Sequence, residues 1–312
     1  MTRAEFLSRY GMAAIFAILV GVLLITNEDF RSPQNLINIL QQNSIIGIVA
    51  CGMLLMIVVG GFDLSVGAVG AMSGVVAAAT IINFGLVPGL VAAVACGLGV
   101  GILNGSLIAK IGINPFVATL GTQVLIYGLL FVATDARPVY GLPPGFTWVG
   151  LGKIGPVPVA VVIYGVVIAA TWLILRRTTF GQHIYSVGGS RDASWLAGVN
   201  VDRVTIATYG IGSLFAAIAG LVLLGQTNIG QPATAEAWPL AAIAAVVVGG
   251  VPLTGGVGGV SAAVLGTLLL GVVANGLNLF SVSPFWQPAI TGLVIIVAVG
   301  LDSYQRKRAG ST

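Results

Sequence analysis

The chain has 312 residues, of which 57% are hydrophobic and only 7% are charged, and its formal net charge is +4. Soluble globular domains carry about 25% charged residues, so most of the outer surface of this fold must face something other than water. The high hydrophobicity excludes an intrinsically disordered chain, and the 45 glycines follow no three-residue period, which excludes a collagen-like helix.

Apolar stretches of membrane-spanning length follow one another along the whole chain. A transmembrane helix needs about 20 mostly apolar residues, with a range of about 17–25. The predicted spans are residues 10–26, 36–59, 64–82, 86–109, 116–134, 157–175, 204–224, 237–250, 257–280 and 287–301. The sequence therefore predicts an all-α, polytopic membrane protein, a single transmembrane domain over residues 1–312, with about ten transmembrane helices and glycine-rich helix breaks near residues 60 and 255.

Basic residues are grouped in three places, and their spacing sets the expected orientation. Arg3 and Arg9 precede the first span, four arginines lie within residues 176–203, and residues 306–308 read Arg-Lys-Arg. Even numbers of spans separate these groups, so all lie on one side, which the positive-inside rule identifies as cytoplasmic. We expect cytoplasmic N- and C-termini, a cytoplasmic segment at about 176–203 and an external loop at about 135–156. No group forms the one-sided basic patch of a nucleic-acid-binding protein, so no nucleic-acid partner is expected.

Two glycine-rich stretches of the chain resemble each other. Residues 60–67 read Gly-Gly-Phe-Asp-Leu-Ser-Val-Gly, and residues 249–256 read Gly-Gly-Val-Pro-Leu-Thr-Gly-Gly. Each is followed by an Asn-Gly pair and then by a Pro-Phe pair. Transporters are often built from repeats with broken helices in corresponding places. We interpret the pair as an internal duplication; the alternative is chance similarity between glycine-rich apolar segments.

Asp63 lies at the first glycine-rich break. An ionisable residue at membrane depth is a functional candidate. We predict that Asp63 caps a helix beginning at Leu64 by accepting backbone N–H groups at its positive end. A direct role toward a solute or a proton is the alternative, although one carboxylate is little for a proton relay.

Uncharged polar side chains lie in or beside several spans. Such groups can hydrogen-bond a neutral, hydroxyl-rich solute, and they can equally bond one helix to another. As a set they favour a polar uncharged cargo over an ion. The residues predicted to line the translocation pathway or to break its helices are Gly60, Gly61, Asp63, Ser65, Asn104, Gln123 and Asn275.

Residues for catalysis are scarce. The single histidine, His183, has no second histidine, carboxylate pair or cysteine cluster near it in sequence, so neither a metal site nor a catalytic triad is expected. The phosphate-binding loop Gly-x-x-x-x-Gly-Lys-Ser/Thr is also missing: the nearest match has Thr147 for the first glycine and Ile154 for the hydroxyl residue. We expect no enzymatic activity and no cofactor in this chain.

The residues that follow Ser190 predict a short cytoplasmic helix. Ser190 is a favourable N-cap, Asp192 suits the first turn and Gly198 suits the end. Such a helix presents Trp195 and Leu196, which we interpret as a docking surface for a partner protein. A helix lying on the bilayer surface, with Trp195 as its interfacial anchor, is the alternative.

The chain resembles the permease subunits of bacterial ABC importers, in the branch that takes up ribose, xylose and autoinducer-2. Residues 60–67 resemble the family signature Gly-Gly-x-Asp-Leu-Ser-Val-Gly. Asn104-Gly105 and residues 114–121 resemble its Asn-Gly and Pro-Phe-x-x-Thr-Leu-Gly pattern. Residues 180–198 resemble its cytoplasmic segment, and residues 249–259 its late glycine-rich stretch.

The resemblance implies that the short cytoplasmic helix couples the permease to an ATPase. The family signature there is Glu-Ala-Ala-x-x-x-Gly, and residues 192–198 read Asp-Ala-Ser-Trp-Leu-Ala-Gly in the same register. Asp192 and Ser194 depart from the signature, and its extended Leu-Pro tail is not apparent. The residues that this resemblance assigns to coupling are Arg191, Asp192, Ala193, Ser194, Trp195, Leu196 and Gly198.

The resemblance also implies an assembly in the lipid of the bacterial inner membrane. Two permease copies would join ABC ATPase subunits, which hold ATP and Mg²⁺, and a periplasmic solute-binding protein. The expected function is alternating-access import of a polar uncharged solute such as a monosaccharide. The alternatives are a stand-alone proton- or sodium-coupled secondary transporter and an integral membrane enzyme.

Overall fold

The computed structural model describes residues 3–283, 285–286, 288–290, 292–293 and 296. The long helices are α1 (Arg3–Thr26), α2 (Pro33–Val58), α3 (Val66–Phe84), α4 (Leu86–Ser106), α5 (Pro115–Thr134), α7 (Val159–Arg177), α10 (Val201–Thr227) and α12 (Val260–Leu279). The shorter elements are α6 (Trp148–Leu151), α8 (Thr179–Gly189), α9 (Arg191–Leu196), α11 (Trp238–Val248), the strands β1 (Lys153–Ile154) and β2 (Val157–Pro158), the 3-10 helices Asp29–Arg31 and Pro144–Thr147, and the π-helix Leu107–Ile111.

The predicted polytopic helical architecture is confirmed. Seven of the described helices are long and apolar enough to cross a membrane, and the shorter apolar helices Phe16–Thr26 and Trp238–Val248 accompany them. Helices occupy the positions of the first nine predicted spans. The tenth, at 287–301, and the basic residues at 306–308 lie largely or wholly outside the described residues. The figure of ten crossings therefore stays a prediction.

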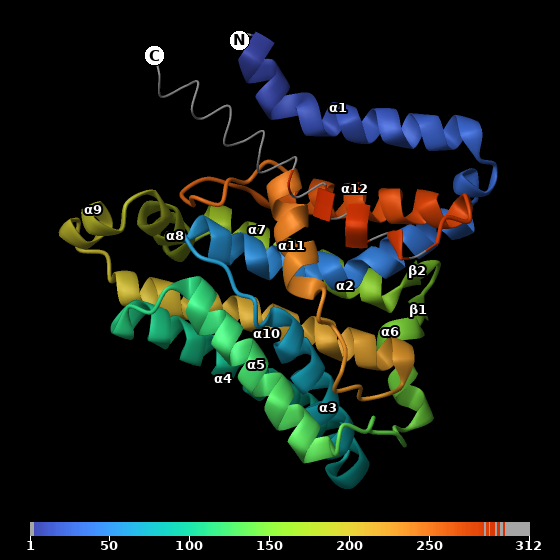
Figure 1. The fold of residues 1–312 in the computed structure, drawn as a ribbon, viewed down its shortest axis with the longest axis horizontal. Coiled ribbons are helices and arrows are strands. Elements are labelled where there is room, and N and C mark those ends of the chain that lie inside the picture. The colour runs from blue at the N-terminus through green and yellow to red at the C-terminus, as the bar shows by residue number, and fades with distance from the viewer. Residues whose placement is uncertain (1–2, 284, 287, 291, 294–295, 297–312) are drawn as a thin grey trace.

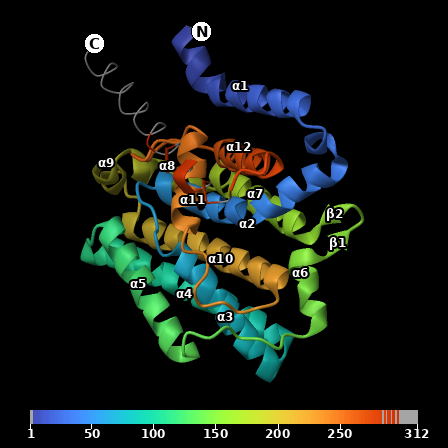
Figure 2. The ribbon, with the colours of Figure 1, turned by 45° about the vertical axis from the view of Figure 1, so that its right-hand side comes forward.

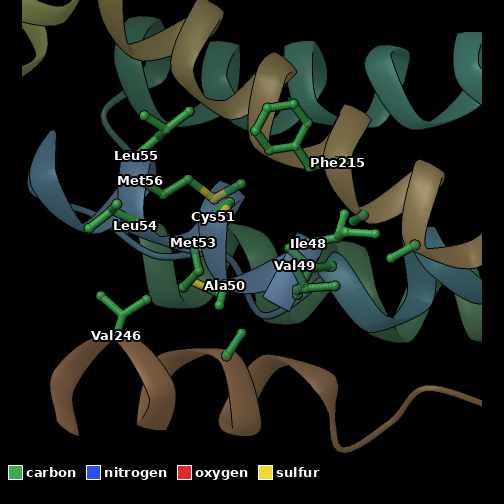
Figure 3. Packing of buried hydrophobic residues seen from close by; sticks show 14 of the residues in the cluster. Ile48, Val49, Ala50, Cys51, Met53, Leu54, Leu55, Met56, Phe215 and Val246 are labelled. Carbon is green, nitrogen blue, oxygen red and sulfur yellow. The ribbon is translucent and has the colours of Figure 1, made fainter. Parts of the chain in front are cut away.

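The centre of the bundle is formed by α2 and α10, with α3, α7, α11 and α12 around them (Figures 1 and 2). Side chains of α2 fill the space between Phe215 of α10 and Val246 of α11 (Figure 3). The two central helices approach closely at Gly52 and Gly212. A Cβ atom added to Gly52 would lie only 2.9 Å from the carbonyl oxygen of Gly212, so this approach requires a glycine. A helix that is apolar all round belongs in such an interior, which is where the structure places α2.

The helices α4 and α5 lie at the periphery and turn much of their apolar surface outward (Figure 1). Val91, Val124 and Val132 have 62%, 66% and 79% of their surface exposed. Leaving such side chains exposed to water is unfavourable by about 25 cal/mol for each Å² of apolar surface. The outward face of these helices is therefore a lipid-facing surface.

The two polar segments predicted from the sequence lie at opposite ends of the bundle (Figure 1). Helices α8 and α9 form one end, whereas α6 and the antiparallel pair β1–β2 form the other. This separation agrees with the prediction that residues 176–203 and 135–156 face opposite sides. The sequence did not predict that each segment folds: α8 is an additional helix in the segment predicted to be cytoplasmic, and the predicted external loop ends in the β1–β2 hairpin.

The two similar glycine-rich stretches end their helices in the same way. Gly60 and Gly250 adopt φ angles of 95° and 96°, which favour glycine. In both places the next residue donates its N–H back across the last turn, from Gly61 to Met56 and from Val251 to Val246. The resemblance in sequence thus corresponds to one shared helix-ending conformation, the Schellman motif.

Candidate functional site

A buried polar network lies at the first glycine-rich break, where α3 begins. Asp63 Oδ1 accepts hydrogen bonds from the backbone N–H and the Oγ hydroxyl of Ser65, both at 2.6 Å. Asn104 of α4 donates to Ser65 Oγ at 2.9 Å, and Thr122 of α5 donates to Asn104 Oδ1 at 2.6 Å. Ser213 of α10 lies 3.4 Å from Asp63 Oδ2. The network therefore joins the break to three helices.

The network explains how a carboxylate can be accommodated in the interior of this bundle. Asp63, Ser65 and Asn104 are all fully buried. A buried polar group is costly unless it is hydrogen-bonded, and here each of these side chains has a partner. Asp63 also lies at the N-terminal end of α3, where the helix dipole favours negative charge. The arrangement positions the start of α3.

The predicted capping role of Asp63 is correct in kind but wrong in register. Helix α3 begins at Val66 rather than Leu64, and Ser65 occupies the N-cap position. Asp63 accepts the N–H of Ser65 just before the helix. The N–H of Leu64 instead donates to Thr119 Oγ1 of α5 at 3.1 Å. Leu64 and Ser65 form a turn before the helix, so α3 begins two residues further along the sequence than the apolar pattern indicates.

The structure brings some predicted pathway residues together and separates others. Asp63, Ser65 and Asn104 share the network, with Gly60 and Gly61 directly before it. Gln123 is partly buried on α5, next to Thr122. Asn275 lies elsewhere and exchanges two hydrogen bonds, of 2.8 and 3.1 Å, with Asn35 of α2.

Three hydroxyl residues of the site were missed by the sequence analysis: Thr119, Thr122 and Ser213. In a membrane helix a serine or threonine usually bonds its own backbone, and both threonines also do so here. Their spacing on α5, at i and i+3, places them on one face. This i, i+3 spacing is the sequence feature that could have identified Thr119 and Thr122 as members of one polar site.

The short helix α9, predicted to be cytoplasmic, has the predicted form. Ser190 Oγ accepts from Ala193 N at 3.2 Å as the N-cap, and Gly198 ends the helix with a φ angle of 84°. Trp195 and Leu196 have 69% and 77% of their surface exposed. Beneath them Ser194 is buried and its Oγ lies 2.7 Å from Ser186 Oγ of α8. Helix α9 thus presents an apolar pair outward while it is fixed to α8.

Helix α8 in turn contacts both glycine-rich breaks. A Cβ atom on Gly188 would lie 1.8 Å from the carbonyl oxygen of Val58, so α8 packs directly on the end of α2. Tyr185 Oη donates to the carbonyl oxygen of Gly258 at 2.7 Å, in the loop before α12. The backbone N–H of Gly256 also donates to Val58 O at 2.9 Å. Helix α8 therefore links α9 to both breaks by direct contacts.

A hollow of about 410 Å³ lies beside α9, between α8 and the start of α10. It is lined by Phe180 and His183 of α8, by Gly198 and Asn200 of the connection, and by Arg203 of α10, among other residues. Arg203 is the one charged residue among the described residues that line it. The hollow and the apolar pair of α9 therefore lie on the same end of the molecule.

Residues 35–299 match the family described as "Branched-chain amino acid transport system / permease component". The chain belongs to this family. The ribose import permease protein RbsC of Escherichia coli (strain K12) is 36% identical over 310 residues, which cover 97% of this chain and 95% of that protein. RbsC of Bacillus subtilis (strain 168) is 39% identical over 91% of this chain and 89% of its own length.

The L-arabinose transport system permease protein AraH of Escherichia coli (strain K12) is 37% identical, covering 96% of this chain and 92% of that protein. No solved structure matches the chain. With these relatives and its apolar helices, this permease is a multi-pass protein of the bacterial inner membrane. It is a transport component rather than an enzyme.

Proposed function

We propose that this permease forms the translocation pathway of an ATP-binding-cassette importer for a neutral monosaccharide. The observation that carries the proposal is the similarity to RbsC and AraH, which extends over nearly the whole of each chain. The family description names branched-chain amino acids. We favour a sugar because the named relatives transport pentoses and because the polar side chains predicted along the spans are mostly uncharged.

The proposed assembly contains two copies of this permease, ATPase subunits on the cytoplasmic face and a periplasmic solute-binding protein. ATP and Mg²⁺ would be held by the ATPase, because this sequence has no phosphate-binding loop. We propose that residues 1–312 form one transmembrane domain that crosses the membrane ten times, with both termini in the cytoplasm. The three basic groups of the sequence support that orientation.

We propose that α9 receives the conformational change of the ATPase and transmits it to the breaks. Residues Arg191–Gly198 would dock, with Trp195 and Leu196 as apolar anchors. The route runs through the Ser194–Ser186 contact into α8, and from there to the end of α2 and to the loop that joins α11 to α12. Two helix ends that meet on one short helix can move together, which alternating access requires.

A stand-alone proton- or sodium-coupled transporter receives no support from the relatives, which are components of importers.

The test is reconstitution of the permease in proteoliposomes with its co-purifying ATPase and binding protein. We expect uptake of radiolabelled ribose or arabinose that requires ATP and persists when an uncoupler collapses the ion gradients. Uptake that stops with the uncoupler at constant ATP would contradict the proposal. Uptake of leucine without uptake of either pentose would support the importer but show that its cargo is an amino acid rather than a sugar.

A further inference from the structure

A cavity of about 230 Å³ opens at the external end of the bundle, between α3, the end of α10 and the loop 228–237. Its inner wall is made of glycines because α3 and α10 nearly touch there. A Cβ atom on Gly220 would lie 2.2 Å from the carbonyl oxygen of Gly70. Gly74 differs, since its nearest neighbour would lie 3.6 Å away. The three glycines Gly70, Gly74 and Gly220 alternate on this wall with Ala71, Leu223 and Leu224, and Gly74 leaves room beside it.

The chemistry of the cavity suits a small neutral polyol. Its walls are mostly apolar, and three polar side chains, those of Thr227, Gln231 and Thr234, lie among its lining residues. None of the described residues that line it is charged. Binding sites for small molecules typically combine apolar walls with a few polar groups, and drug-sized ligands need about 300–1,000 Å³. A volume below that range fits a single sugar ring.

The outer wall of the cavity is an irregular segment that the fold holds in place. The backbones of Gly230 and Val139 exchange two hydrogen bonds of 2.9 Å, which fasten the segment to the external loop. Tyr127 Oη of α5 donates to the carbonyl oxygen of Thr234 at 2.7 Å. An ordered wall presents its polar groups in fixed positions, which recognition of a small ligand requires.

The cavity is also connected to the buried network at the start of α3. The carbonyl oxygen of Ala235 packs on Gly67, where an added Cβ atom would lie only 2.2 Å away. Gly67 follows Ser65 of the network by two residues. A shift of the break that moves the first turn of α3 would therefore press on the segment 228–237. The site is placed where its shape can follow the state of the helix break.

We propose that this cavity is the site on the permease that accepts the monosaccharide from the external side. The inference rests on the proposed function and adds the place and the groups of recognition. Gln231 and Thr234 would hydrogen-bond sugar hydroxyls, since hydroxyls and amides both donate and accept. The Thr227 hydroxyl already donates to the carbonyl oxygens of Leu223 and Ile229 and accepts from the N–H of Ile229, so it lines the wall. The glycine wall would pack against the carbon skeleton of the ring.

The test is Gly74→Val, which adds methyl groups to the cavity wall at the glycine that has room for a Cβ atom. The matched control is Gly128→Val on the outward face of α5, where an added Cβ atom meets nothing within 4 Å. In proteoliposomes with the ATPase and binding protein, we expect initial D-ribose uptake to fall at least about tenfold for Gly74→Val. Gly128→Val should retain wild-type uptake, and both variants should retain ATPase binding.

A second variant distinguishes a loss of sugar recognition from a loss of folding. Thr234→Val keeps the side-chain shape and removes the hydroxyl, while the backbone contact of Thr234 with Tyr127 is untouched. We expect a several-fold higher sugar concentration for half-maximal uptake. Wild-type uptake by both Gly74→Val and Thr234→Val would overturn the inference and leave the importer intact. Failure of the wild-type assembly to take up ribose or arabinose would instead count against the proposed function.

Discussion

Asp63 provides the sharpest test of the network, because two substitutions of similar size change its chemistry differently. In Asp63→Asn the side-chain oxygen can still accept both hydrogen bonds of Ser65, and the new amide can donate to Ser213 Oγ. In Asp63→Leu the shape is roughly kept, but the N–H and the Oγ hydroxyl of Ser65 lose their buried acceptor. The pair separates hydrogen bonding from bulk.

The structure gives an approximate magnitude for each change. A buried polar group left without a partner costs about 1–3 kcal/mol, and side-chain hydrogen bonds in membrane proteins contribute about 0.6 kcal/mol on average. Ser65 loses its acceptor for two donors in Asp63→Leu, so we expect that variant to be destabilised by about 2–4 kcal/mol. For Asp63→Asn we expect a loss of under about 1 kcal/mol, since each hydrogen bond has a replacement.

The assay combines thermal unfolding in mild detergent with ATP-driven uptake in proteoliposomes. Asp63→Asn should unfold near the wild-type temperature and retain most uptake, whereas Asp63→Leu should unfold at a clearly lower temperature and lose uptake. A correctly inserted, wild-type-stable Asp63→Asn protein without transport would refute the reasoning. That result would assign the negative charge, rather than the hydrogen bonds, to the transport cycle.

Three further predictions address the coupling helix and the helix contacts. Trp195→Ala removes an exposed side chain, so we expect unchanged stability but uptake reduced at least about tenfold relative to ATP hydrolysis, measured in the assembled importer. Gly101→Val should overpack the contact between α4 and α10, because a Cβ atom there would lie 2.4 Å from the carbonyl oxygen of Tyr209. Overpacking should destabilise the fold by about 1–3 kcal/mol or more, which thermal unfolding measures with Gly128→Val as the control. A double-mutant cycle of Asn35→Ala and Asn275→Ala should give a coupling free energy of about 1 kcal/mol in the same unfolding assay.

Helix positions and the cytoplasmic helix could be predicted from the sequence because each depends on local properties. Apolar length alone locates a membrane helix. Ser190 and Gly198 likewise mark the two ends of α9 through side-chain capping and a positive φ angle, which are properties of single residues. The exposure of Trp195 followed from the shortness of that helix, which leaves few residues to cover it.

The partners within the site could not be predicted in the same way. Ser65 meets Asn104 and Asp63 meets Ser213 only after α3, α4 and α10 pack together, and those pairs are 39 and 150 residues apart in the sequence. Asn275 illustrates the opposite error, since its position in a span resembled that of Asn104. Its partner is Asn35 rather than a pathway residue. Polarity within a span marks a contact but does not tell which helix supplies the other half.

The two glycine-rich breaks are best understood together, because each needs the other. A Cβ atom on Gly255 would lie 2.9 Å from the Cα atom of Gly60, so the loop after α11 packs directly on the turn after α2. Both turns also contact α8, through Gly188 and Tyr185. Side chains at these positions would separate the three segments and break the contacts on which the proposed coupling from α9 depends. The glycines therefore serve less to loosen the chain than to let three backbones touch, and in the proposed importer this contact would let α8 act on both breaks.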